Sequence, residues 1–404
     1  MEESRLPISD QTTLVINTGS SSLKFGLYVE RDGEEQLVLD GLADGIGRDA
    51  SKLTLKDAQG KVLRYEVLGF ASEADALDRA TQWLTDFSQC KPSAIGHRVV
   101  HGGPNLVTHQ LITPALVKEL EACVHFAPLH IPTALELMRR SEQVYKGIPQ
   151  FACFDTAFHT TVPEEAARFA LPRTLFQEGI RRYGFHGLSY ESIVHAVGND
   201  LPSRTVIAHL GSGASLAAVR DRRSVDTTMG LTPTGGIPMA TRSGDLDPGV
   251  ILYLLRVKQM DADSLEQLLN HDSGLTALSG GQGDMRDLEA AADAGDAEAR
   301  QAIEIFCTSI RKVVAAYATV LGGLDMLIFS GGIGEHSDRV RSSVCGGLQF
   351  LGISIDPSDK STPGETGSNE KSMVDVRVVS SQEDLQIARH CRAMMRKMKA
   401  KGPP

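Results

Sequence analysis

The same pattern of apolar runs and small polar residues occurs in two segments about half a chain apart, Leu14–Leu27 and Val206–Val219. Each segment has an apolar run, a turn of small residues rich in Gly and Ser, and a second apolar run, which predicts a β-hairpin. Small residues let the turn approach a ligand, and its N–H groups and hydroxyls suit phosphate oxygens. Two such hairpins predict two related domains that each offer a phosphate-binding turn to a shared cleft. Two ordinary tight hairpins are the alternative.

The same periodicities predict further elements. Strands are expected at Thr13–Asn17, Leu23–Val29, Ile95–His101, Phe151–Phe154, Asp325–Phe329 and Val374–Val379, and helices at Leu116–Val124, Thr133–Val144, Arg300–Leu321 and about Gln382–Met398. Met229–Gly249 is rich in Gly, Pro and Thr and predicts a long functional loop. The longest apolar stretch, Val313–Phe329, is interrupted by two glycines and Asp325, so we expect a helix and then a strand rather than a membrane span.

Composition narrows the class of protein. The 404 residues are too many for one core, which favours two domains, and 41% hydrophobic with 23% charged residues is ordinary for a globular protein. The net charge of −10 argues against a nucleic-acid partner. The six cysteines are scattered and read as free thiols, and Met1–Gln11 lacks the apolar core of a signal peptide. We therefore expect a cytoplasmic enzyme without a membrane partner.

Two arginines and four carboxylates are candidates for phosphoryl chemistry. Arg98 lies on an apolar strand and Arg242 lies in the long loop, and guanidinium groups match phosphate and carboxylate oxygens. A buried structural ion pair is the alternative for each arginine. Candidate magnesium anchors at strand or loop ends are Asp155, Asp284, Glu335 and Glu383. A helix cap is the alternative for Asp155, and the first turn of the last helix is the alternative for Glu383.

Histidine is plentiful, with twelve in the chain, so one histidine alone indicates little. His186 is the most informative because two arginines and two glycines surround it, and His130 follows in a turn bracketed by prolines. His97, His101 and His209 lie on predicted strands, where a satisfied core histidine is the alternative. The sequence has no zinc-site spacing, P-loop or protein-kinase motif, so a nucleotide enzyme of another class is expected.

Six segments, taken in order, resemble the acetate kinase family, which belongs to the superfamily of acetate and sugar kinases, actin and heat-shock ATPases. The segments are Asn17–Lys24, Gly96–Gly103, Ala127–His130, Phe154–His159, Arg182–Gly187 and Thr241–Pro248. The resemblance runs from about Thr13 to Arg389. It implies two duplicated actin-like (ribonuclease H-like) α/β domains, formed by 1–157 plus 385–404 and by 158–384, with an interdomain active-site cleft. It also implies reversible transfer of the ATP γ-phosphoryl group to acetate, with Mg²⁺ or Mn²⁺ and usually in a homodimer.

The family pattern also assigns roles to matching positions of this chain. The implied catalytic residues are Asp155, Arg98, Arg242 and His186, and the implied metal ligands are Asn17 and Glu383. The implied substrate set is Arg98, Val100, Leu129, His130, Phe185 and Pro233, four of which (Val100, Leu129, Phe185 and Pro233) would surround the acetate methyl group. The implied nucleotide set is Lys24, His209, Leu210, Gly211, Ser212, Gly213, Asp284, Met285, Arg286, Gly332, Ile333, Gly334, Glu335 and His336, and Ser20 and Ser22 would join Lys24 in the first phosphate turn. Acetate is already anionic near pH 7 and needs no general base, so Asp155 is expected to orient groups or the metal while acetate attacks in line.

Three positions depart from the family pattern. Ser212 and His336 stand where Asn is usual, and Gln382 stands for the common Asn before Glu383. All three remain polar and lie near implied nucleotide or metal contacts, so they bear on nucleotide choice more than on the type of reaction.

Three other functions compete with acetate phosphorylation. A propionate or longer-chain acyl kinase differs only by pocket size, and one methylene is worth about 1–3 kcal/mol of binding. A non-catalytic ATPase switch of the actin and heat-shock type would not need Arg98, Arg242 and His186 opposite the nucleotide. A sugar kinase would need a base for a hydroxyl group and polar sugar contacts, whereas the implied pocket is mostly apolar.

Overall fold

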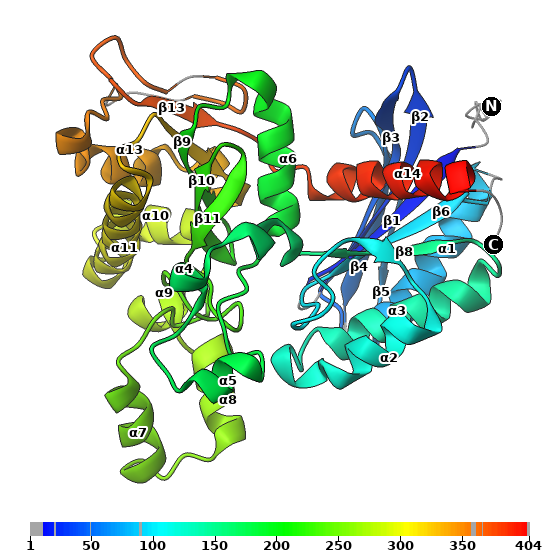
Figure 1. Ribbon diagram of the computed structural model, residues 1–404, viewed down its shortest axis with the longest axis horizontal. Helices are drawn as coiled ribbons and strands as arrows, with labels where there is room; N and C mark the ends of the chain where they lie inside the picture. The colour runs from blue at the N-terminus through cyan, green and yellow to red at the C-terminus, as the bar shows by residue number, and fades with distance from the viewer. Residues whose placement is uncertain are drawn as a thin grey trace. The chain divides into compact units, whose positions relative to one another are not determined.

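The chain folds into two compact units. The computed structural model describes residues 11–19, 22–48, 50–88, 91–356, 361–365 and 367–401. Unit 1 comprises Met1–Ala157 and Gln382–Pro404, and unit 2 comprises Phe158–Ser381. Each unit is built on one mixed β-sheet with helices packed against it (Figure 1), so the predicted α/β class is confirmed.

The sheet of unit 1 has eight strands in the order β5-β4-β3-β2-β1-β6-β8-β7. They are β1 (Thr12–Thr18), β2 (Ser22–Arg31), β3 (Glu34–Asp44), β4 (Ser51–Asp57), β5 (Val62–Leu68), β6 (Ala94–Val99), β7 (Gln110–Leu111) and β8 (Gln150–Phe154). Strands β1, β6 and β8 run parallel to one another, whereas β1–β5 form successive antiparallel pairs. The carboxyl ends of the three parallel strands therefore lie at one edge of the sheet.

Helices cover both faces of this sheet. They are α1 (Glu73–Ser88), α2 (Pro114–Ala122), α3 (Ile131–Val144) and α14 (Glu383–Lys401). Side chains alternate along β1, and Leu14 and Ile16 join a core that includes Trp83 of α1 and Leu137 of α3. The last helix contacts β1 and β6, as the resemblance implied, and lies across the sheet in Figure 1. At Gly96 of β6, an added Cβ would lie 2.5 Å from Ile387 of α14, so this close approach requires glycine.

The sheet of unit 2 has five strands in the order β11-β10-β9-β12-β13. They are β9 (Arg204–Leu210), β10 (Ala214–Arg220), β11 (Arg223–Thr227), β12 (Met326–Ser330) and β13 (Asp375–Val378). The helices of this unit are α4 (Glu164–Ala167), α5 (Arg173–Gln177), α6 (Gly187–Val197), α7 (Pro248–Arg256), α8 (Ala262–His271), α9 (Gly274–Leu278), α10 (Met285–Asp293), α11 (Ala297–Leu321), α12 (Gly331–His336) and α13 (Asp338–Gly346). Residues of α6 share a core with β9, β10 and β12, and α11 also packs on β9 and β10.

The two sheets share one topology, which explains why the two hairpin segments, Leu14–Leu27 and Val206–Val219, have the same sequence pattern. In each unit, the first three strands form consecutive antiparallel pairs. A further strand runs parallel to the first strand and lies beside it, and another parallel strand follows on its far side. The matching orders are β3-β2-β1-β6-β8 and β11-β10-β9-β12-β13. The two Gly/Ser turns lie at the same position in each unit, between the first and second strands.

Most predicted elements are present, and their ends differ for local reasons. Strand β6 ends at Val99, two residues before the predicted end, and beyond it the His101 ring accepts the Gly103 N–H at 2.8 Å. Helix α3 begins at Ile131 rather than Thr133, because Pro132 fits the first helical turn, where its missing N–H is harmless. Within the residues that the structure describes, no helix is long and apolar enough to cross a membrane.

Candidate active site

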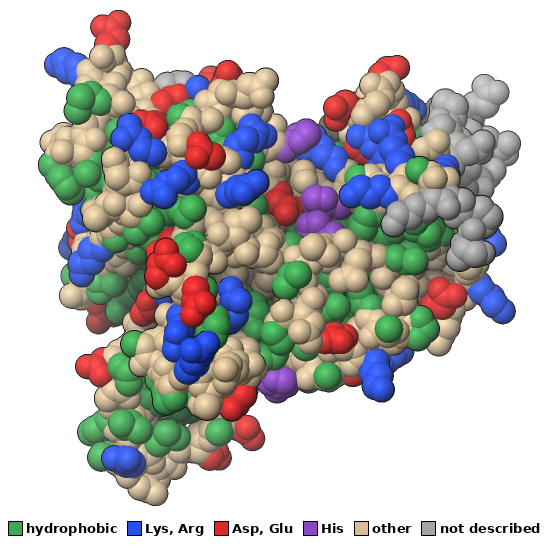
Figure 2. Space-filling view, in the orientation of Figure 1, with side chains coloured by type: hydrophobic (Ala, Val, Ile, Leu, Met, Phe, Trp, Pro, Cys, Tyr) green, Lys and Arg blue, Asp and Glu red, His purple; other side chains and the backbone are tan. Residues whose placement is uncertain are grey.

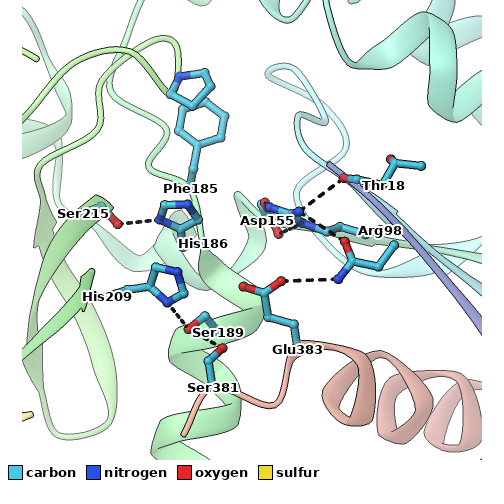
Figure 3. Close-up of polar contacts among 12 residues, drawn as sticks. Thr18, Arg98, Asp155, Phe185, His186, Ser189, His209, Ser215, Ser381 and Glu383 are labelled. Carbon is cyan, nitrogen blue, oxygen red and sulfur yellow. Dashed lines mark hydrogen bonds and ion pairs between the residues drawn. The ribbon is translucent and has the colours of Figure 1, made fainter. Parts of the chain in front are cut away.

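The carboxyl edge of the unit 1 sheet gathers three polar side chains on parallel strands. Asn17 is near the end of β1, Arg98 is near the end of β6, and Asp155 directly follows β8. The register pairs Arg98 with Cys153, and the Asp155 N–H donates to the Val99 carbonyl at 3.0 Å. Figure 3 shows Arg98 turned toward Asp155 and Thr18 at this edge.

Asp155 holds Arg98 from the side. Arg98 Nε lies 3.1 and 3.0 Å from the two Asp155 carboxylate oxygens, and its NH2 donates to Oδ2 at 2.6 Å. The Asp155 side chain is 1% exposed and that of Arg98 is 16% exposed. Burial alone lowers the pKa of Arg98, but Asp155, with Glu383 and Asp384, raises it above its ordinary value, so the guanidinium stays charged. The alternative of a buried ion pair is therefore present here, and it fixes the orientation of the arginine.

Asn17 links this pair to the start of α14. Its Oδ1 accepts from Arg98 NH1 at 3.2 Å, and its Nδ2 lies 3.4 Å from Glu383 Oε2 and 2.6 Å from Asp384 Oδ1. Burial, together with the neighbouring Glu383, raises the pKa of Asp384. The predicted metal ligands Asn17 and Glu383 therefore lie side by side, with the amide nitrogen of Asn17 rather than its oxygen toward the carboxylate. Glu383 also occupies the first turn of a helix, which was the alternative for this residue.

The first turn is described only in part. Gly19 N–H donates to the Ser22 carbonyl at 2.9 Å, and exposed Lys24 pairs directly with Asn17 across the hairpin. Ser20 lies outside the described residues. The charge of Lys24 is near enough to Asp384 to oppose part of the rise in the pKa of that carboxyl, so it lies toward the same edge.

The predicted substrate positions of unit 1 lie directly after β6 and directly before α3. Val100 is 9% exposed and directly follows β6. His130 precedes the first residue of α3, with its N–H donating to the Ala127 carbonyl at 3.0 Å, and Leu129 beside it is 52% exposed. Their predicted contacts with acetate stay a prediction.

In unit 2, His186 is held in an unusual backbone conformation. It precedes α6 with φ of 58°, a left-handed value that few residues other than glycine adopt. Its Nδ1 lies 2.9 Å from Ser215 Oγ of β10, as Figure 3 shows. Its ring centroid is 4.4 Å from that of His209 on β9, whose Nδ1 lies 2.8 Å from Ser189 Oγ. Phe185, the residue before His186, is buried.

Arg242 approaches the same turn from the long loop. A Cβ added at Gly213 would lie 3.3 Å from His186 Nε2 and 3.6 Å from Arg242 NH1, so both groups face the backbone at this glycine. Arg242 NH1 also donates to the Pro233 carbonyl at 3.1 Å. The loop is tied to the hairpin because the Ala240 N–H donates to the Ser212 carbonyl at 3.1 Å. Unit 2 thus brings His186, Arg242 and the second Gly/Ser turn together.

A third turn lies beside the second one. Strands β9 and β12 run parallel, with His209 opposite Ser330, so residues His209–Gly213 and Gly332–His336 follow neighbouring strand ends. A Cβ added at Gly331 would lie 2.7 Å from the Leu210 carbonyl oxygen, which explains the glycine. Ile333 is partly buried, and Gly332 and His336 are exposed.

The carboxylate of Glu335 accepts hydrogen bonds from residues close to it in the fold. Its Oε1 accepts the Gly331 N–H at 3.0 Å and the Ser381 N–H at 3.2 Å, and its Oε2 accepts from Ser380 at 2.8 Å. These contacts fix the turn after β12 and oppose the reading of Glu335 as a magnesium anchor.

The predicted nucleotide residues Asp284, Met285 and Arg286 form a separate group. Asp284 precedes α10 and its side chain accepts the Arg286 N–H at 2.9 Å, which makes it a helix cap. The two side chains also pair at 2.7 Å. This group presents an exposed arginine, and among the residues that the structure describes no hydrogen bond or ion pair joins its side chains to the two glycine-rich turns.

Of the three histidines predicted to lie on strands, two are buried core residues and the third is not. His97 Nε2 lies 2.7 Å from Gln150 Oε1, and burial lowers its pKa to about 4. His101 is fully buried, whereas His209 is partly exposed beside His186. Among the described residues, five cysteines are buried and form no disulfide; Cys90 lies outside them.

Comparison with known proteins gives the family. The model of the Acetokinase family matches residues 12–389. The chain belongs to the acetokinase family. An acetate kinase from Methylocella silvestris is 42% identical over an alignment of 402 residues that covers 96% of this chain and 98% of that protein.

Two solved structures of this family share the fold. The Porphyromonas gingivalis acetate kinase is 34% identical with a TM-score of 0.85, and a propionate kinase from Francisella tularensis is 35% identical with a TM-score of 0.89. Each alignment covers 95% of this chain and 100% of the other. The expected family and fold are confirmed.

Several polar contacts of the candidate site residues were not predicted from the sequence. Asp384 bonds Asn17, and Ser215, Tyr190 and Ser189 surround the histidines. The signal for Asp384 was its place beside Glu383 in the first turn of the last helix. The serines and the tyrosine carry no sequence signal, because they meet the histidines only through the packing of α6 on the sheet.

Proposed function

We propose that this chain is an acetate kinase that transfers the γ-phosphoryl group of ATP reversibly to acetate. The observation that carries the proposal is its similarity, over nearly its full length, to an acetate kinase. The site geometry supports it in both units. Asp155 fixes the orientation of Arg98 in unit 1, and in unit 2 both His186 and Arg242 face one glycine-rich turn. A phosphoryl transferase needs this kind of positioned positive charge more than it needs covalent chemistry.

The proposed step needs no protein nucleophile. A carboxylate oxygen of acetate attacks the γ-phosphorus, the bond from that phosphorus to the bridging oxygen breaks, and ADP leaves with the electron pair. Acetate is ionised near pH 7, so no proton has to be removed. A single in-line displacement inverts the configuration of a chiral γ-phosphoryl group; retention would instead require a phosphorylated intermediate.

The proposed roles follow from where the groups lie. Arg98 and Arg242 bind the carboxylate and the transferred phosphoryl group, and His186 donates to its equatorial oxygens. Asp155 orients Arg98 through two nitrogen atoms and acts as a positioning residue rather than a base. The turns at His209–Gly213 and Gly332–His336, with Asp284–Arg286 and Lys24, bind the nucleotide.

We assign the magnesium site to Asn17 and Glu383. Magnesium prefers oxygen ligands and commonly takes one or two carboxylates, with phosphate and water completing its shell. Glu383 and Asp384 supply carboxylate oxygens beside the Asn17 carboxamide, whose Nδ2 faces them while its Oδ1 accepts from Arg98. With the carboxamide turned over, Oδ1 would complete an oxygen donor set, and Mn²⁺ would accept the same ligands. When bound, the ion would neutralise charge on the phosphates.

Propionate is the second candidate substrate. A propionate kinase is among the structures this chain resembles, with a TM-score of 0.89. Hydroxylamine trapping of acyl phosphate with ATP, magnesium and acetate, propionate, butyrate or no acid separates the readings. We expect the highest kcat/KM with acetate. Preference for propionate changes the substrate only, whereas ADP release without any acyl phosphate indicates an ATPase switch.

We further propose a homodimer in which α7 contacts a second copy of this chain. None of the residues of α7 is buried, although the helix is mostly apolar. Exposed apolar side chains on and around it are Leu246, Val250, Leu252, Tyr253, Leu255 and Val257. Figure 2 shows apolar side chains gathered over the region of α7 in Figure 1. Contiguous apolar surface of this kind is typical of subunit interfaces. Because ATP is the donor, we place the enzyme in the cytoplasm.

A further inference from the structure

A fully buried hydroxyl pair stands behind His186. Ser215 on β10 and Tyr190 on α6 are both 0% exposed. Ser215 Oγ lies 2.9 Å from His186 Nδ1 and 2.6 Å from the Tyr190 hydroxyl oxygen. The serine therefore bridges the tyrosine and the imidazole, on the side of the ring away from Gly213.

The hydrogens of this chain of contacts can be assigned by counting donors. Burial raises the pKa of Tyr190, so its hydroxyl keeps its proton. Among the described residues, Ser215 Oγ is the one hydrogen-bond partner of that hydroxyl, and a buried donor without an acceptor is costly. Tyr190 therefore donates to Ser215, which leaves the hydrogen of Ser215 for His186 Nδ1.

This assignment fixes the state of the imidazole. Nδ1 that accepts a hydrogen bond carries no proton, so the neutral ring bears its hydrogen on Nε2. Nε2 is the atom that faces Gly213, next to Arg242 NH1. The backbone at His186 is left-handed, and such a conformation persists in a residue other than glycine only where the surrounding structure holds it, so this position is well fixed.

The neighbouring histidine repeats the arrangement. His209 Nδ1 contacts Ser189 Oγ, which accepts a hydrogen bond from Ser381 Oγ at 2.8 Å (Figure 3). With ring centroids 4.4 Å apart, two imidazolium ions would repel each other. Proximity thus favours the neutral form that the hydroxyl pair also selects.

We propose that Tyr190 and Ser215 are positioning residues that hold neutral His186 as its Nε2–H tautomer, ready to donate to the transferred phosphoryl group. The tautomer rests on the hydrogen-bond geometry, and its effect on rate rests on the proposed function. Without Ser215, Nδ1 loses its donor and the ring samples both tautomers, so only part of the enzyme presents a hydrogen toward the phosphoryl group.

Ring-nitrogen NMR tests the tautomer directly. In protein labelled with ¹⁵N-histidine, the His186 signals are identified by their loss in His186→Asn, since asparagine tolerates the left-handed backbone. We expect a protonated Nε2 and an unprotonated Nδ1 at neutral pH. A protonated Nδ1, alone or together with Nε2, overturns the proposal, whether or not the protein phosphorylates acetate.

Kinetics tests the positioning role. Ser215→Ala alone leaves the Tyr190 hydroxyl unpaired and can impair folding, so the main variant is the double change Ser215→Ala with Tyr190→Phe. We expect kcat to fall about tenfold, the size of one lost hydrogen bond, with both KM values unchanged and both tautomers visible by NMR. Tyr190→Phe alone should fall less, because Ser215 can still donate.

Tyr145→Phe is the matched control. It also removes a buried hydroxyl that bonds another hydroxyl, that of Thr81, but in the core of unit 1. We expect its kcat and its His186 signals to match the wild type. An unchanged kcat in the double variant overturns the positioning role, whereas a wild-type enzyme without acyl phosphate overturns only the proposed function.

Discussion

Arg98, at the edge of the unit 1 sheet, has structural contacts as well as the catalytic role that we propose for it. Arg98 forms a buried ion pair with Asp155, and the same guanidinium bonds Asn17. Sequence alone left the ion pair and the substrate clamp as alternatives, because a strand arginine fits both. The structure shows that the pair is present, so variants have to separate stability from catalysis.

Removing Arg98 alone should cost both stability and activity. In Arg98→Ala, Asp155 stays buried without its cation, which we expect to lower the free energy of unfolding by about 3 kcal/mol. Urea denaturation measures this loss. The double variant Arg98→Ala with Asp155→Ala should recover much of the stability and remain inactive. Activity that returns with stability would show that Arg98 has only a structural role.

Buried neutral histidines should make stability depend on pH. Burial lowers the pKa values of His97 and His159 to about 4, from 6.5. The unfolded chain therefore binds protons first as the pH falls, so stability is full above about pH 6.5 and declines toward pH 4, by up to ~1.4 kcal/mol per pH unit for each histidine.

Denaturation of His97→Gln across this pH range isolates one contribution. Glutamine can still donate to Gln150, and it does not titrate. We expect the variant to lose less stability than the wild type between pH 6.5 and pH 4. Parallel curves for the two proteins would contradict a depressed pKa at His97.

At the scale of helices and strands, the sequence predicted those elements whose formation depends on the residues within them. The hairpins, α11 and β12 follow from alternation, helical spacing and glycine ends. The antiparallel strands β3, β4 and β5 were not predicted, and on β5 the residues are only partly buried or exposed, which weakens any alternation of apolar and polar positions. The contact of Asn17 with Glu383 joins residues 366 apart, and no local pattern carries such information.

The packing of α14 on β6 should tolerate no side chain at position 96. In Gly96→Ala, the new Cβ meets Ile387 and Cys391, which we expect to destabilise the protein by about 1–3 kcal/mol. Gly346→Ala is the control, since a Cβ added there would have no atom within 4 Å. Thermal unfolding compares the two. Equal melting temperatures of the two variants would contradict this, because they would mean that α14 moves away from the new Cβ without loss of stability.

At the scale of the whole molecule, we predict that the chain forms a homodimer through the exposed apolar surface of α7. Leu252→Asp with Tyr253→Asp places two charges on this surface, and we expect a dimer to become a monomer in sedimentation velocity runs. Phe350→Asp changes an exposed apolar residue outside α7 and should leave the dimer intact. A dimer that survives the α7 changes would place the interface elsewhere.

The duplicated sheets and full-length similarity converge on one central claim, that this chain moves a phosphoryl group between ATP and acetate. The most direct measurement runs the reaction backward with acetyl phosphate, ADP and magnesium, and follows ATP. Because acetyl phosphate is a mixed anhydride, this direction is favourable. We predict that one ATP forms for each acetyl phosphate consumed, and that Arg242→Ala abolishes this. Consumption of acetyl phosphate without ATP, or none at all, would contradict the account.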